Sequence, residues 1–99
     1  MAHLDLYANP DGPGWLLDLQ SDLLDGMATR VVAPVMPADA APRPAARLNP
    51  VVQVEGVDAV LVAQFLAAVP ASILGAPVGS LAAERDAVTA SLDMLFHGF

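Results

Sequence analysis

The sequence predicts a mainly β domain that is closed by one C-terminal α-helix. Three observations support this fold class. Apolar and polar residues alternate in several short segments, glycine- and proline-containing turns separate these segments, and helical periodicity is confined to the C-terminal part. Because 99 residues is the length of one domain, we expect a single domain over residues 1–99.

Residues 3–8 and 15–20 are predicted to form the first hairpin. In both segments apolar side chains recur at every second position, as in a strand with one buried face. Residues 9–14 contain two prolines and two glycines, which favour a turn. Residues 21–26 are expected to turn the chain again, and the β-branched segment 29–35 to form the next strand.

Proline dominates the middle of the chain. Five prolines lie between Pro34 and Pro50, a density that neither a regular helix nor a central strand tolerates. We interpret residues 36–47 as a surface excursion that mainly connects strands. Residues 51–55 and 58–65 then predict a second hairpin, whose second strand is apolar enough to be buried on both faces.

Residues 59–83 carry no charge, which raises the question of a membrane span. Proline, glycine and polar residues interrupt this segment too densely for one, so we expect buried protein and no membrane association. Ser80 is a candidate N-cap for a helix over residues 81 to about 96. Its predicted apolar stripe contains Leu81, Val88, Leu92 and Leu95.

Composition excludes several functional classes. Eleven acidic residues against four arginines give a formal charge of −7, which disfavours direct nucleic-acid binding. The absence of cysteine removes disulfides and thiolate metal sites, and two histidines are too few for a histidine-built site. We therefore expect no cofactor and no metal. Apolar residues make up 56% of the chain, an excess that suggests a subunit interface.

The sequence contains no convincing catalytic group. None of the serines lies in a glycine-flanked nucleophile elbow, so a serine hydrolase is disfavoured and we expect no enzyme. Asp22 and Asp25 could converge as an acid/base or cation-binding pair, but capping of the turn is the favoured interpretation. The start of the chain has no signal-peptide pattern, so the cytoplasm is the default compartment.

The C-terminal segment is unusually apolar for a chain end. We expect Phe96 to fold onto the core, Gly98 to cap the helix and His97 to lie at the negative end of its dipole. For His97, Gly98 and Phe99 two interpretations stay open. Either Phe99 also folds back, or the three residues form an exposed aromatic tip that inserts into a partner.

Five collinear segments together resemble the CcdB toxin family over nearly the whole chain. The segments are 17–25 (LDLQSDLLD), 30–35 (RVVAPV), 48–52 (LNPVV), 69–75 (VPASILG) and 95–99 (LFHGF). The resemblance implies a homodimer with an SH3-like barrel of antiparallel strands and a C-terminal helix. It also implies a toxin that binds the A subunit of DNA gyrase and traps the gyrase-DNA cleavage complex.

In that family the last three residues, typically Trp-Gly-Ile, bind gyrase by placing the indole against an arginine, and here they correspond to His97, Gly98 and Phe99. Two of the three residues differ. Imidazole offers a smaller cation-π surface than indole, so its presence should weaken binding by roughly 1 to 3 kcal/mol. We expect Phe99 to recover part of this loss.

The resemblance also implies a CcdA-like antitoxin with a disordered tail that folds on binding, repression of the module's own promoter by the pair, and a role in plasmid maintenance. The proline-rich stretch from Pro34 to Pro50 departs from the family, so a tail that binds there must differ too. A dimer would carry twice −7, or about −14, and would repel an acidic tail. We therefore expect an apolar tail with basic or near-neutral character.

Two alternatives remain. A CcdB-like protein could bind antitoxin after losing or switching the gyrase target, because its tip has changed. An RNA-cleaving toxin of the MazF type would share the architecture, but four scattered arginines make a basic groove difficult to build.

Overall fold

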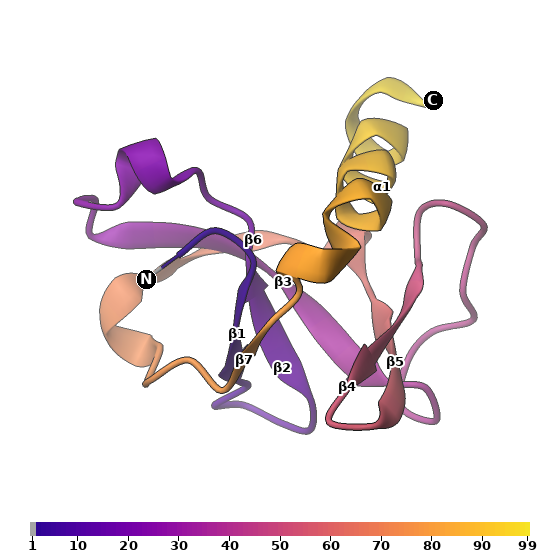
Figure 1. Cartoon of the computed structure of the whole chain (residues 1–99), viewed down its shortest axis with the longest axis horizontal. Coiled ribbons are helices and arrows are strands. Elements are labelled where there is room, and N and C mark those ends of the chain that lie inside the picture. The colour runs from indigo at the N-terminus through magenta and orange to yellow at the C-terminus, as the bar shows by residue number, and fades with distance from the viewer. Residues whose placement is uncertain (1) are drawn as a thin grey trace.

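The computed structural model describes residues 2–99, which form seven strands and one α-helix with short 3₁₀ turns between them (Figure 1). The strands are β1 (Asp5–Ala8), β2 (Trp15–Asp18), β3 (Thr29–Pro37), β4 (Val51–Val54), β5 (Val57–Leu61), β6 (Ala67–Pro70) and β7 (Gly79–Ser80), and the helix is α1 (Arg85–His97). The 3₁₀ turns are Asp22–Leu24, Ala63–Phe65, Ala71–Ile73 and Ala82–Glu84.

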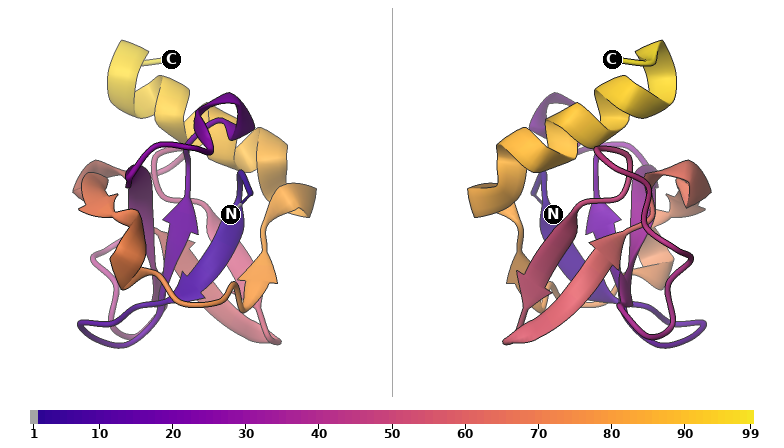
Figure 2. Two further views of the ribbon diagram at one scale, coloured as in Figure 1. Left: turned by 90° about the vertical axis from the view of Figure 1, so that its left-hand side faces the viewer. Right: turned by 90° about the vertical axis from the view of Figure 1, so that its right-hand side faces the viewer.

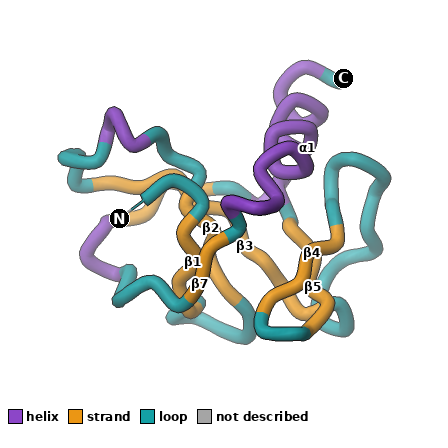
Figure 3. The backbone as a smooth tube through the Cα atoms, viewed as in Figure 1, coloured by secondary structure: helices purple, strands orange, loops and turns teal. Residues whose placement is uncertain are grey.

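All strand pairs are antiparallel, and the sheet runs in the order β4-β5-β3-β2-β1-β7. The sheet curls into a nearly closed barrel, and α1 rises from one end of it (Figures 2 and 3). The long strand β3 pairs with β5 through its C-terminal part and with β6 through its N-terminal part. This architecture confirms the predicted β barrel with a C-terminal helix.

Pro34 lies inside β3, where a proline removes a donor from the ladder. The carbonyl oxygen of Pro34 accepts a hydrogen bond from the backbone N–H of Val62 at 2.9 Å. Because the N and O of one strand residue point to the same edge, the proline nitrogen faces the junction where the chain leaves β5 before β6 begins. The missing N–H therefore lies between the part of β3 that pairs with β5 and the part that pairs with β6.

The alternation in the first hairpin places apolar side chains on both faces of the sheet. The larger cluster fills the barrel and includes Leu6 and Leu17, against which Leu81 and Val88 pack from the C-terminal part. A smaller cluster covers the opposite face and contains Tyr7, Leu16, Val32 and Leu74. The prediction of one half-buried face is therefore wrong for the centre of these strands, because residues around Leu74 cover the second face.

The first strand is shorter than predicted. It begins at Asp5 and not at residue 3, because Leu4 takes a left-handed conformation with φ of 68°. The backbone N–H of Leu4 donates to Asp18 O at 2.7 Å, and its carbonyl accepts from Leu81 N at 2.8 Å. Leu4 is fully buried, so packing and these two bonds offset the strain.

The uncharged segment 59–83 differs most from expectation. Its first five residues are buried, as predicted, but β5 ends at Leu61 and not at residue 65. The short strands β6 and β7 were not predicted, and most residues of 64–80 are exposed, so the expectation of buried protein is wrong for that part. Among the described residues, no helix is long and apolar enough to cross a membrane.

The remaining elements agree with the sequence in outline. Residues 38–50 form an irregular, largely exposed connection, although β3 continues through Pro37. Ser80 caps the chain before the helix, since its Oγ accepts from Ala82 N at 3.1 Å. It caps the 3₁₀ turn Ala82–Glu84, however, and α1 begins only at Arg85.

Candidate functional site

The C-terminal end of α1 projects beyond the barrel (Figure 1). The first turns of the helix bury Val88 and Ser91, and Leu92 packs on the core. Phe96 follows one turn later and is 62% exposed, so the prediction that it folds onto the core is wrong. The reason is geometric, because the C-terminal end of the helix extends past the edge of the barrel (Figure 1).

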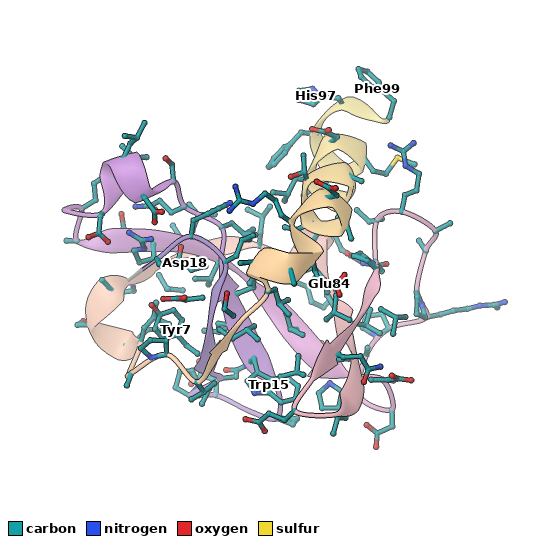
Figure 4. The ribbon with its side chains drawn as sticks, in the orientation of Figure 1. Tyr7, Trp15, Asp18, Glu84, His97 and Phe99 are labelled. Carbon is teal, nitrogen blue, oxygen red and sulfur yellow. The ribbon has the colours of Figure 1, made fainter. Side chains whose placement is uncertain are left out.

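The terminal tripeptide, His97, Gly98 and Phe99, is also exposed. Gly98 caps the helix as predicted, with φ of 80° and its N–H donating to Met94 O at 3.1 Å. This left-handed residue turns the chain so that Phe99 points away from the barrel, and the Phe99 side chain is 73% exposed (Figure 4). The structure therefore excludes the folding back of Phe99 onto the core, while insertion of the tip into a partner stays a prediction.

The three aromatic rings of the tip are neighbours. The centroid of the His97 ring lies 6.5 Å from that of Phe96 and 6.1 Å from that of Phe99, with the rings tilted in both pairs. These distances are in the range of favourable edge and offset contacts between rings. The tip therefore presents a compact aromatic surface to solvent.

A second exposed apolar group lies on the loop of residues 21–28, between β2 and β3. Leu23 is 94% exposed, and Leu24 and Met27 are about half exposed. The views of Figures 1 and 2 place this loop and the C-terminal end on the same side of the barrel. The sequence prediction did not identify this loop as a candidate binding site. The signal that could have done so is the pair of adjacent leucines, Leu23 and Leu24, in a turn that is expected to be exposed.

The base of this loop contains a buried ion pair. Arg30 and Asp18 are both fully buried, and the arginine donates to Asp18 Oδ2 from Nε at 3.0 Å and from Nη2 at 2.5 Å. Arg30 Nη1 also contacts Asp25 Oδ1 at 3.5 Å. Removing either charge from water without its partner would cost much free energy, and the ion pair offsets this cost.

The aspartates of the loop have structural contacts. Ser21 caps the turn through its Oγ, and Asp22 accepts from the backbone N–H of His3 at 2.7 Å. The favoured interpretation, capping of the turn by Asp22 and Asp25, holds for Asp25, which is the C-cap and donates its backbone N–H to Asp22 O. The N-cap is Ser21, and the Asp22 carboxylate binds the N-terminal segment instead. Over residues 2–99 no group of three histidine or acidic residues is placed to hold a metal, and no pocket is enclosed.

Tyr7 is fully buried and lies near Asp18 of the ion pair (Figure 4). Its hydroxyl has no hydrogen-bond partner among the described residues. Burial, and then the negative charges of Asp5 and Asp18, raise the pKa of the Tyr7 phenol above its ordinary value. The phenol is therefore protonated at neutral pH.

Comparison with known families identifies one match. The sequence model of one family, described as CcdB protein, matches residues 3–98, nearly the whole chain. The chain belongs to the CcdB family. CcdB-family membership indicates the toxin of a toxin-antitoxin module, in a family not known for catalysis. A search of curated proteins found no match.

Proposed function

We propose that this CcdB-family chain acts by binding the A subunit of DNA gyrase and trapping the gyrase-DNA cleavage complex. The observation that carries the proposal is the display of the terminal tripeptide, in which Phe99 is 73% exposed at the end of a projecting helix. Aromatic side chains on a rigid support are the usual anchors of protein interfaces, because they bury a large area at a small entropic cost.

The loop of residues 21–28 supplies a second contact in this proposal. The loop lies on the same side of the barrel as the tripeptide, and its Leu23 and Leu24 are 94% and 48% exposed. Burying a leucine side chain on binding contributes about 1.5 to 3 kcal/mol before the costs of association. Two separated apolar contacts on one side favour a large protein target.

We propose further that the chain acts as a homodimer. The exposed part of the uncharged segment includes Phe65, Ile73 and Val78, and each of these side chains is more than two-fifths exposed. A charge-free apolar surface of this kind is typical of an interface between subunits. Sedimentation equilibrium tests the dimer, and a monomer at micromolar concentration would contradict it.

The antitoxin is proposed to be CcdA-like, with an apolar tail of basic or near-neutral character. The formal charge of −7 per chain supports this choice, because it would repel an acidic tail. Titration calorimetry with synthetic tails of opposite charge tests the proposal. Nanomolar binding of a strongly acidic cognate tail would overturn it.

The decisive experiment is a gyrase cleavage-complex assay with purified protein. The wild type should linearise supercoiled plasmid in the presence of gyrase, and a variant lacking Gly98 and Phe99 should not. Val57→Ala is the matched control, because Val57 is exposed and apolar but is the first residue of β5, next to the β4–β5 turn and away from the tip. Cleavage by the truncated variant at the wild-type level would refute the role of the tip.

A second candidate function is binding of antitoxin without poisoning of gyrase. His97 favours it, because an imidazole occupies the tip position where a tryptophan is typical of the family. Harmless overexpression together with tight antitoxin binding would support this candidate. The variant His97→Trp should then create toxicity, whereas a gyrase poison should only gain potency.

A further inference from the structure

The loop of residues 21–28 has a defined shape although apolar burial does not hold it. Every residue from 21 to 29 is exposed, and the 3₁₀ turn Asp22–Leu24 contains no buried residue. A short exposed loop of this kind normally samples many conformations. Its order must therefore come from hydrogen bonds. Asp22 Oδ1 accepts from the backbone N–H of His3, and the carbonyl oxygen of Ala28 accepts from the N–H of Ala71. The carbonyl oxygen of Leu24, in the middle of the loop, accepts from a buried side chain.

That side chain is the amide of Gln20, which is buried directly beneath the loop. Its Nε2 donates to the carbonyl oxygen of Leu24 at 3.2 Å and to that of Thr29 at 3.1 Å. Its Oε1 accepts from the backbone N–H of Val31 at 3.1 Å. The amide thus links the tip of the loop to the strand that follows it.

The buried ion pair holds Gln20 itself in place. Asp18 Oδ1 accepts from the backbone N–H of Gln20 at 3.0 Å, while Asp18 Oδ2 is bound by Arg30. Both charges are fully buried, so this part of the base is rigid. The contact between Arg30 and Asp25 adds a second connection from the same base to the loop.

We propose that Gln20 is a positioning residue for partner binding, which fixes the loop of residues 21–28 so that Leu23 and Leu24 are presented in a preorganised arrangement. This inference rests on the proposed function, since it assigns the loop to the gyrase contact. Without the amide, the two leucines would become ordered only on binding. The entropic cost of this ordering would then weaken the affinity for the partner.

The test compares Gln20→Met with Gln53→Met. Methionine keeps the length of the side chain and removes all three hydrogen bonds of Gln20. The control alters a glutamine of β4 that is exposed and bonds only to Asp58 across the hairpin. Hydrogen exchange is measured on the free proteins, and affinity is measured for a fragment of the gyrase A subunit.

In Gln20→Met the backbone amides of Leu24, Met27 and Val31 should exchange about tenfold faster than in the wild type, whereas the strands remain protected. Affinity for the gyrase fragment should fall about tenfold, which corresponds to the cost of ordering one or two side chains. Gln53→Met should change neither quantity.

A double-mutant cycle with Leu23→Ala measures whether the effect of Gln20 on binding depends on Leu23. Such dependence is expected if Gln20 positions the loop, and not if it only stabilises the fold. If Gln20 acts through the loop, Gln20→Met should weaken binding less than about twofold in the Leu23→Ala background. A full tenfold loss in that background would overturn the proposal, and so would an unchanged affinity of Leu23→Ala itself.

Two further outcomes are distinguished. If the wild type does not bind gyrase, the proposed function fails, yet exchange on the free protein still decides whether Gln20 orders the loop, and unchanged exchange refutes it. If Gln20→Met does not fold, Gln20→Glu replaces it, because glutamate keeps the acceptor for Val31 and removes both donors. Unchanged exchange of Leu24 and Met27 in that variant would overturn the inference.

Discussion

Two exposed apolar regions on one side of the barrel are held in place by different means. The loop of residues 21–28 is ordered from below, by the buried amide of Gln20 and the pair of Arg30 and Asp18. The terminal tripeptide is ordered from within its own helix, by the left-handed cap at Gly98. The loop therefore depends on contacts between distant strands, and the tip depends on local helical geometry.

This difference predicts how substitutions in each region affect stability and binding. Damage to the buried base should reach the whole fold and the loop together, because removal of one charge leaves the other buried without the ion pair that offsets its desolvation. Damage to the Phe99 side chain should reach binding alone, because this side chain is 73% exposed and its aromatic neighbour, His97, belongs to the same tip. Four predictions test this contrast, in order of the expected change in free energy.

Arg30→Met should have the largest effect. It leaves the Asp18 carboxylate buried without its cation, which should lower the free energy of unfolding by about 3 to 5 kcal/mol. Urea unfolding at neutral pH measures this loss. The double variant Asp18→Leu with Arg30→Met should lose much less, and a loss below about 1 kcal/mol in Arg30→Met alone would show that the pair is not the base of the loop.

Phe99→Ala should weaken binding to the gyrase fragment by about 2 kcal/mol, or roughly 30-fold, as for an interface hot spot. Its unfolding free energy should stay within about 0.5 kcal/mol of the wild type, because the side chain is mostly exposed. Calorimetric binding and urea unfolding check the two parts. Equal losses in stability and in binding would contradict the independence of the tip.

Gly98→Ala should destabilise the end of α1 by about 1 kcal/mol. The cause is conformational, since the residue has φ of 80° and an added Cβ meets nothing within 4 Å. Faster amide exchange at the end of α1 would report the change. Gly12→Ala is the control, because Gly12 also has open space around it and no positive φ.

Tyr7→Phe should have the smallest effect and change stability by about 0 to 1 kcal/mol in the favourable direction, because the buried hydroxyl has no partner among the described residues. Burial raises the pKa of Tyr7 above 10.0, so the unfolded chain ionises first as the pH rises. Wild-type stability should therefore fall as the pH rises above about 10. In Tyr7→Phe the stability should fall less over this pH range, since phenylalanine does not ionise. The same dependence of stability on pH above about 10 in both proteins would contradict the prediction.

Sequence reasoning recovered the parts of the fold that depend on local pattern. The hairpin of β1 and β2 follows from alternation around a turn of glycine and proline, and Gly98 was identified as the cap from its position after the last periodic residue. It missed β6, because this mostly exposed segment has no alternation and only one β-branched residue, Val69, between alanines and a proline. It also placed Phe96 on the core, since periodicity does not reveal where the barrel ends.

The candidate site divides in the same way. The terminal tripeptide was identified from its composition alone, as an aromatic segment where chain ends are normally polar. Most of the loop of residues 21–28 was assigned only as a turn over 21–26, and Gln20 was included only as the last residue of the predicted strand 15–20. Neither role is visible until β2 and β3 pair and bring Gln20, Asp18 and Arg30 together.

The sequence by itself determined that this chain is a β barrel with a C-terminal helix, that it carries strong negative charge and that it ends in an aromatic tip. These properties depend on neighbours within a few residues or on composition. Tertiary structure alone decided which apolar side chains stay exposed and which polar ones are buried, because burial depends on segments far apart in the chain. The partner contacts proposed here therefore follow from packing as much as from pattern.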